Sequence, residues 1–180
     1  MIIRKTIYKI LFLIFGLLNQ LNLHFKFRII GNVLDKIRMK ILIICGANIG
    51  KNSTIDPNTM LLDPKNLIIG ENTHIGSNSE IFNYVKFSIG DNVDIGTQFY
   101  INTNNHKFDN PNKLVAYQGT NSSPIEIGSD IWIGARVTIL AGVKINDRVV
   151  IGAGSVVTKD LESGYVYAGV PVRVIKKLNS

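Results

Sequence analysis

The most regular feature of the chain is a repeat of six residues that opens on an aliphatic side chain. Thirteen such units fall between residues 49 and 162. Their first residue is Ile in 12 and Val in one, their second is Gly in eight, and their fourth is Asn, Asp or Gly in ten. A helix repeats every ~3.6 residues and a strand every ~2, so a period of six indicates a short strand followed by a tight corner.

Aliphatic residues at one fixed place fill an interior. Gly, Asn and Asp at another fixed place tolerate the left-handed backbone conformation that a corner requires. We therefore predict an all-β solenoid over residues 45–162, with three six-residue sides per coil and parallel strands joining each coil to the next.

The repeat is interrupted once by a long excursion. Residues 107–126 contain no six-residue unit and are rich in Asn, Pro, Ser and Gly, and the register returns intact at Ile127. Loops of this length inside a compact repeat are usually functional or disordered. After the last unit, residues 163–180 form a predicted C-terminal tail that folds back over the final coil.

The N-terminal segment, residues 1–44, differs from everything after it. It is basic and apolar, and its uninterrupted apolar run at residues 10–18 is nine residues long, short of the roughly 20 that span a bilayer. No cleavage site of the secretory type follows it. Two interpretations stay open and are compatible: a helical cap over the first coil, or an interfacial helix in contact with anionic headgroups.

Charge sharpens this division of the chain. The net charge is +7, and residues 1–40 hold eight basic side chains against one acidic, whereas residues 41–180 hold 12 of each. A nucleic-acid-binding protein should carry its basic face on the folded body, so that class is disfavoured. The single cysteine, Cys45, excludes an intrachain disulfide and is expected to be buried. No Cys/His cluster has zinc-like spacing, so we expect no metal.

The best candidate for chemistry is His106. It ends the last unit before the excursion, where regular backbone can position it and the excursion can close over it. Neutral imidazole can take a proton from a hydroxyl or an amine near neutral pH. His74 instead closes a unit where side chains usually face solvent. Nucleophile-elbow and phosphate-loop motifs are absent from the sequence, so one histidine base suits direct transfer between two bound substrates.

The repeat, the excursion after a histidine, and the ending DIWIGARVTILAGVKINDRVVIGAGSVVTKD with AGVPVRVIKKL resemble the hexapeptide-repeat acyltransferases. The likeness is strongest to sugar and surface-polysaccharide O-acetyltransferases. It implies a left-handed parallel β-helix, an exception to the usual right-handed crossover. It also implies a homotrimer that binds acetyl-CoA in clefts between neighbouring subunits, without a metal.

The same resemblance assigns roles to individual residues. His106 is similar to the general base of the family, which would deprotonate the acceptor for attack on the thioester. The residues implied to contact the acceptor are Asn83, Asn104, Asp109 and Trp132. Those implied to line the acetyl-CoA site are Gly134, Ala135, Ala153, Thr158, Lys159, Arg173 and Lys176. Trp132 could equally be a corner residue that stacks on its neighbour, and Asp109 or a main-chain carbonyl could orient the imidazole.

We therefore expect an acetyl-CoA-dependent O-acetyltransferase acting on a sugar of a surface polysaccharide or its precursor, with a carbohydrate partner and no nucleic acid. Two alternatives remain: N-acetylation of a nucleotide-linked amino sugar, and a non-catalytic trimeric scaffold. The expected location is cytoplasmic, with peripheral contact at the inner face of the membrane through residues 1–40 as the finer possibility.

Overall fold

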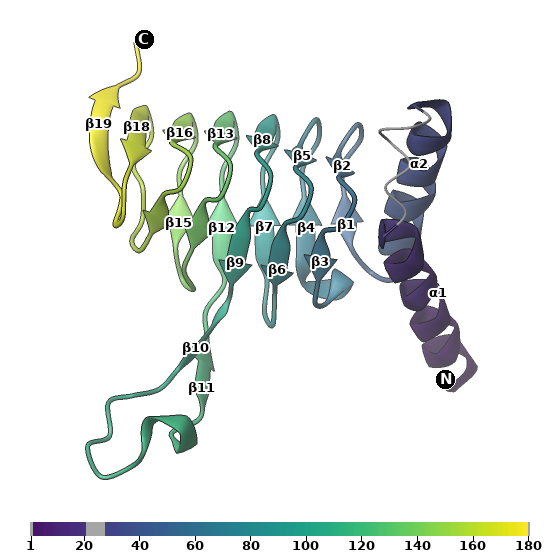
Figure 1. Cartoon of the computed structure of the whole chain (residues 1–180), viewed down its shortest axis with the longest axis horizontal. Helices are drawn as coiled ribbons and strands as arrows, with labels where there is room; N and C mark the ends of the chain where they lie inside the picture. The colour runs from purple at the N-terminus through teal and green to yellow at the C-terminus, as the bar shows by residue number, and fades with distance from the viewer. Residues whose placement is uncertain (1, 21–27, 180) are drawn as a thin grey trace.

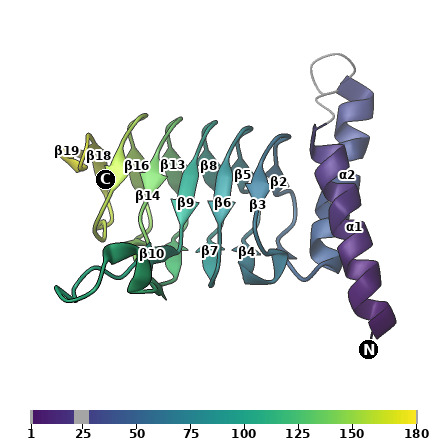
Figure 2. The ribbon, with the colours of Figure 1, turned by 60° about the horizontal axis from the view of Figure 1, so that its bottom comes forward.

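The computed structural model describes residues 2–20 and 28–179, in two helices followed by a solenoid whose strands form three faces (Figures 1 and 2). The helices are α1 (Ile2–Gln20) and α2 (Arg28–Ile44). The parts of the expected N-terminal segment at residues 1 and 21–27 lie outside the described residues. The neighbouring strands of each face are parallel, except for the final pair β18 and β19. The predicted fold class is confirmed.

Each face is a ladder of short strands from successive coils. Face A contains β1 (Asn48–Ile49), β4 (Leu67–Ile69), β7 (Phe87–Ile89), β12 (Ile125–Ile127) and β15 (Lys144–Ile145). Face B contains β2 (Thr54–Ile55), β5 (His74–Ile75), β8 (Val93–Ile95), β13 (Ile131–Ile133), β16 (Val149–Ile151), β18 (Tyr165–Ala168) and β19 (Arg173–Lys177). Face C contains β3 (Met60–Leu61), β6 (Glu80–Phe82), β9 (Tyr100–Asn102), β14 (Thr138–Ile139) and β17 (Val156–Val157).

The first residue of the unit fills the interior, as the pattern predicts. Ile75, Ile95 and Ile133 stack in consecutive coils of face B, and each is completely buried. The fourth residue makes the corner, because it has positive φ in 11 of the 13 units, in nine as a non-glycine residue and in two as Gly. The two exceptions are Asn104 and Asp160. Asn104 opens the excursion, and Asp160 lies in the last unit, so a fourth residue without positive φ marks the places where the chain leaves the repeat.

The second residue of the unit is Gly for a different reason, which is the closeness of the next coil. A Cβ built on Gly96 would lie 2.6 Å from the backbone nitrogen of Ala135, and one on Gly134 would lie 2.5 Å from that of Ala153. Neither glycine has positive φ. These positions therefore need Gly because backbone packs directly on backbone at the corner.

The excursion differs from the expected range 107–126 and is not structureless. It begins at Asn104, where β10 (Asn104–His106) pairs antiparallel with β11 (Thr120–Ser122). A 3-10 turn, η2 (Val115–Tyr117), lies between these strands. Ile125 already belongs to face A. The hairpin projects from the corner between faces C and A and leads away from the helices (Figures 1 and 2).

The C-terminal residues continue face B before they reverse. Strand β18 pairs parallel with β16, and β19 then folds back antiparallel on β18. A hydrogen bond of 2.7 Å from Arg148 Nη2 to the carbonyl of Asn179 holds the end of the chain near the solenoid.

At the other end, α1 and α2 cover the first coil. Phe15 and Leu42 are buried there, and so is Cys45. Arg38, 1 % exposed, pairs with Asp35 over 2.7 Å and donates to the carbonyl of Ile55. Burial lowers the pKa of Arg38, against the charges of Asp35 and Asp56.

Arg38 supplies the hydrogen-bond donor that a preceding coil would otherwise provide. The carbonyl of Ile75, one coil further on, accepts from the backbone N–H of Asp56. No coil precedes Ile55 to offer such a donor, so the guanidinium satisfies this edge carbonyl, which would otherwise be left buried without a partner. A short 3-10 turn, η1 (Pro64–Asn66), closes the first coil. Within the described residues, neither helix has the length and apolar character needed to cross a bilayer.

Candidate functional site

His106 ends strand β10, and its position is set by the hairpin. Its backbone pairs with Thr120, and the N–H of Lys107 donates to the carbonyl of Gly119 over 3.0 Å. The imidazole is exposed, and no residue within 2–20 or 28–179 hydrogen-bonds it. The hairpin thus presents a free imidazole on a hydrogen-bonded backbone beside the solenoid.

The tip of the hairpin combines internal order with an apolar surface. The side chain of Gln118 accepts from the N–H of Asn110 over 2.9 Å and donates to the carbonyl of Lys113 over 2.9 Å. The large apolar side chains that the tip leaves exposed are Phe108, Leu114, Val115 and Tyr117. A soluble monomer rarely exposes such a group of side chains without a partner for it.

The residues expected to receive acetyl-CoA lie elsewhere, on the corner between faces B and C. Gly134 and Ala135 follow β13, and Ala153 follows β16 one coil later. Ala153 is exposed, so the backbone of this corner is open to an approaching ligand. Trp132 lies in face B with 58 % of its surface exposed, beside a hollow of about 580 Å³ that Arg148 also lines.

The other residues expected near acetyl-CoA, three of them basic, lie in two separate places. Arg173 and Lys176 are exposed on β19, at the edge of face B. Thr158 and Lys159 are exposed just after β17. They occupy the corner between faces C and A, the same corner that carries the hairpin.

Of the three residues expected to bind the acceptor near His106, one has a structural role instead. Asn83 is completely buried; its amide donates to the carbonyl of Asp63 over 2.6 Å and accepts from the N–H of Asp63 over 3.0 Å. Its side chain ties two coils together and has no surface to offer a ligand. Asn104 accepts from Ser122 Oγ over 3.0 Å across the hairpin. Asp109 is exposed and makes no hydrogen bond with His106.

One chain therefore does not bring the expected site together. His106 and Lys159 lie at the corner between faces C and A, whereas Ala135 and Ala153 lie at the corner between faces B and C. Strands of face C separate these two corners in every coil. Within one chain, the two sets of residues therefore lie at different corners of the solenoid.

Comparison with known proteins identifies the family. A model of the bacterial transferase hexapeptide (six repeats) matches residues 124–159, and a model of the hexapeptide repeat of succinyl-transferase matches residues 66–102. The crystal structure of a maltose O-acetyltransferase from Clostridium difficile 630 is 36 % identical, with a TM-score of 0.73 over 81 % of this chain and 76 % of that one. The chain belongs to the hexapeptide-repeat acetyltransferases.

Two further relatives bear on the chemistry expected of this family. A galactoside acetyltransferase solved in complex with coenzyme A is 36 % identical, with a TM-score of 0.74 over 80 % of this chain and 71 % of that one. A putative lipopolysaccharide biosynthesis O-acetyl transferase of Escherichia coli K12, WbbJ, is 47 % identical over 32 % of this chain. The aligned segment spans only 29–30 % of the length of such curated relatives. The family expected from the sequence motifs is confirmed.

The structure also reveals a charged cluster that the sequence motifs did not suggest. In face B, His74 Nε2 lies 3.2 Å from Asp56 Oδ1, and His74 Nδ1 lies 3.1 Å from Asp94 Oδ1. The bond to Asp56, helped by Asp94, raises the pKa of His74 to about 9, although burial opposes it. His74 joins three successive coils through these two aspartates. The 20-residue spacing between His74 and Asp94, one coil of the repeat, was the available signal.

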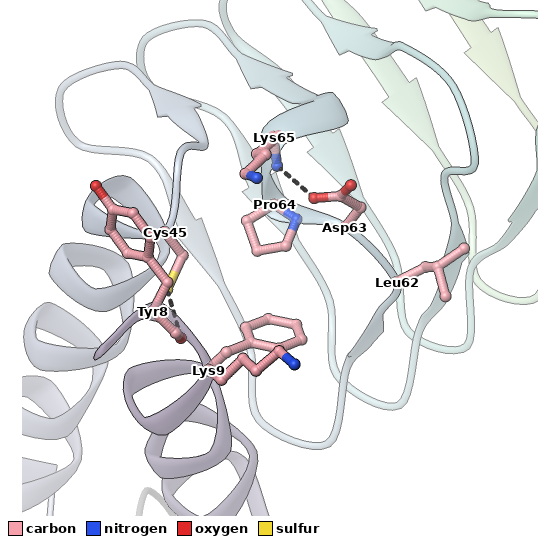
Figure 3. A pocket seen from close by; sticks show the side chains of 8 residues that line it. Tyr8, Lys9, Cys45, Leu62, Asp63, Pro64 and Lys65 are labelled. Atoms are coloured by element: carbon pink, nitrogen blue, oxygen red, sulfur yellow. Dashed lines mark hydrogen bonds between the residues drawn. The ribbon is translucent and has the colours of Figure 1, made fainter. Parts of the chain in front are cut away.

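A cavity of about 320 Å³ lies at the N-terminal end of the solenoid, between α1 and the first coil. Figure 3 shows Tyr8 and Lys9 of α1 facing Pro64 and Lys65 across it. None of the expected site residues lines this cavity. Of the described residues, no group of three or more His, Cys, Asp or Glu side chains could hold a metal ion.

Proposed function

We propose that the protein transfers an acetyl group from acetyl-CoA to a sugar hydroxyl of a surface polysaccharide or its precursor, with His106 as general base. Membership of the hexapeptide-repeat acetyltransferases carries the proposal. The relatives with sugar substrates or coenzyme A in their names support it, and WbbJ supports an acceptor in surface-polysaccharide synthesis.

His106 suits the role of base because its imidazole is exposed and free of partners in its own chain. A neutral ring nitrogen takes the proton of the acceptor hydroxyl as the oxygen attacks the thioester carbonyl. The tetrahedral intermediate then collapses, the carbon–sulfur bond breaks, and the thiolate of CoA recovers the proton from the imidazolium. The products are the acetylated sugar and CoA, so atoms and charges balance without a further reactant.

The acetyl-CoA site fits the corner between faces B and C. Ala135 and Ala153 carry no atom beyond Cβ there, so the pantetheine arm can lie against the backbone and hydrogen-bond with it. Gly134 is buried beneath Ala153 and would act by letting the two coils stack closely. Arg173 and Lys176 supply positive charge for phosphate groups from β19, and Lys159 supplies it from the other corner.

We infer a homotrimer in which the hairpin of one copy reaches the acetyl-CoA corner of the next. Two observations support this arrangement: the division of the site residues between two corners, and the exposed apolar tip at Phe108, Leu114 and Tyr117. A neighbouring copy would cover that tip and place His106 opposite Ala135 and Ala153. We also propose a cytoplasmic location, because acetyl-CoA is the donor, and contact with the inner face of the membrane, because the N-terminal helices are basic.

Acetyl transfer is tested by thiol release from acetyl-CoA with a panel of soluble sugar and amino-sugar acceptors. His106→Ala should lower kcat by roughly 10²–10⁴-fold and leave the KM for acetyl-CoA nearly unchanged. His74→Gln is the matched control, because this histidine is held by two aspartates away from the hairpin, and it should keep its turnover. Near-full turnover by His106→Ala would overturn the assignment of the base. Absence of acetyl-CoA binding in calorimetry would favour a scaffold instead.

The two-copy site is tested by mixing inactive variants. His106→Ala lacks the base, and Ala153→Trp obstructs the acetyl-CoA corner, so each should be inactive by itself. Mixed trimers contain some sites that take His106 from one copy and Ala153 from another, and these should regain activity. No recovery after mixing would place both residues in a site within a single chain.

A further inference from the structure

The outer surface of the helical cap carries a second apolar face that nothing in the described chain covers. One face of α1 packs on the solenoid through Phe15, with Leu11, Phe12 and Leu18 against the same core. The opposite face exposes Ile7, Ile10, Leu13, Ile14 and Leu17, with Leu13 at 70 % and Leu17 at 67 % exposed. A surface helix normally has one apolar stripe, and a helix that is apolar all round is usually buried on every side.

The exposed face of α2 extends this surface and adds charge. Its solvent side carries Val33, Ile37 and Ile44, each between 40 % and 52 % exposed, and the exposed lysines Lys36 and Lys40. Long lysine side chains can lie along an apolar surface with the ammonium group at its polar boundary. The mixture of bulky aliphatics and lysines is typical of helices that lie in the plane of a membrane interface.

The charge of the segment indicates what covers this face. The described structure pairs Arg38 with Asp35, the one acidic residue of positions 1–40, and buries that guanidinium inside the cap. Seven basic residues of the segment remain without an acidic counterpart in it, while the rest of the chain is balanced. A second copy of the same cap would bring like charges together, whereas an anionic surface complements them.

We propose that the outer face of α1 and α2 docks on an anionic lipid surface, the apolar side chains entering the interface and the lysines contacting headgroup phosphates. This deepens the proposed function by naming the partner of the cap. Burial of the apolar side chains supplies part of the affinity, and attraction between the lysines and the anionic headgroups supplies the rest. Because salt screens that attraction, binding should weaken as the salt concentration rises.

Docking through this face would also set the distance between His106 and the lipid surface. Both helices run across the end of the solenoid, and the coils stack away from their outer side (Figures 1 and 2). The helix layer separates the first coil from the lipid by about 10 Å. The hairpin leaves the solenoid at the third coil, which lies two strand spacings of about 4.8 Å beyond the first. His106 then works at roughly 20 Å or more above the surface, which suits a sugar some distance along a lipid-anchored chain better than the sugar joined to the lipid.

The test is flotation of the full-length protein with vesicles of phosphatidylcholine alone and of phosphatidylcholine with phosphatidylglycerol. We expect binding to the anionic vesicles, weakened by salt, and little binding to the neutral ones. Leu13→Gln with Leu17→Gln should lower the partition constant by roughly tenfold or more. Lys36→Gln with Lys40→Gln should lower it by roughly tenfold at low salt.

The matched control is Val174→Gln with Ile175→Gln, which removes two exposed aliphatics at the opposite end of the solenoid and should bind vesicles like the parent. All the substituted side chains are exposed, so the urea midpoint should stay the same and report intact folding. Equal vesicle binding by the Leu13/Leu17 variant and the parent, or no binding by the parent, overturns the proposal. A mass that falls for the Leu13/Leu17 variant in light scattering without lipid, together with no vesicle binding, would assign the face to a second copy.

Turnover with a soluble acceptor in the absence of vesicles separates this proposal from the proposed function. If turnover is present and vesicle binding is absent, only the lipid contact is wrong. If vesicles bind and no acceptor is acetylated, only the acetyl transfer is wrong.

Discussion

Gly96→Ala tests whether the glycine at the second place of the repeat is required by the next coil. The added Cβ would stand 2.6 Å from the backbone nitrogen of Ala135 and 2.9 Å from its Cα. Ordinary contacts between nonbonded carbon atoms are about 3.5–4.0 Å. The two coils must therefore separate by about 1 Å at this corner, because both sides of the contact are backbone and neither can rotate away.

The cost follows from the bonds that this separation stretches. The N–H of Gly96 donates to Ile133 over 2.8 Å, and that of Arg136 donates to Thr97 over 2.9 Å. A shift of this size takes both beyond the usual hydrogen-bond range, at about 0.5–1.5 kcal/mol each. Strain from overpacking adds about 1–3 kcal/mol. Together these terms give an expected loss of about 2–6 kcal/mol in the free energy of unfolding, or roughly 4–24 °C in Tm.

The assay is thermal unfolding by circular dichroism at one fixed protein concentration, since an oligomer has a concentration-dependent Tm. Gly16→Ala is the matched control. Its Cβ would meet no atom within 4 Å, and it lies inside α1, where Ala stabilises a helix relative to Gly by about 0.5–1 kcal/mol. Its Tm should stay level or rise. If the two variants shift Tm alike, or if Gly96→Ala stays at the parent value, close stacking is not the reason for these glycines.

Three further predictions concern single side chains. His74→Gln should destabilise by about 1 kcal/mol after allowance for solvent screening. Because the pKa of His74 rises from 6.5 to about 9 on folding, this loss should be complete below about pH 6.5 and vanish as pH rises past about 9; a constant loss in urea titrations would contradict an imidazolium. Arg38→Met should cost about 2–4 kcal/mol, because the carbonyl of Ile55 loses its donor; an unchanged urea midpoint would exclude that edge role. Trp132→Ala should raise a substrate KM with little change in kcat if the ring contacts ligand, and neither constant should move if it only packs on its neighbours.

The hexapeptide pattern predicted the coil well because its cause is local. The aliphatic first residue and the corner-forming fourth residue each act within their own turn, so Ile95 and Asn92 have the predicted roles wherever the coil lies in the stack. The family resemblance added predictions, His106 as the base and the corner of Ala135 and Ala153 for acetyl-CoA, and these stay predictions. Nothing in the sequence indicated that Asn83 would be buried, because its partner Asp63 belongs to the preceding coil.

Contacts between coils depend on the length of every turn and excursion between them, and only the tertiary structure decided these. In face B, Ile95 stacks 20 residues after Ile75, but Ile133 follows 38 residues later and Ile151 only 18 after that. The sequence by itself determined the solenoid, its interior and its basic, apolar N-terminal segment. The folded chain decided that a glycine column separates the coils, that Arg38 closes the first one, and that His106 and the proposed acetyl-CoA corner lie on different edges, because each of these is set by distances between residues that are remote in sequence.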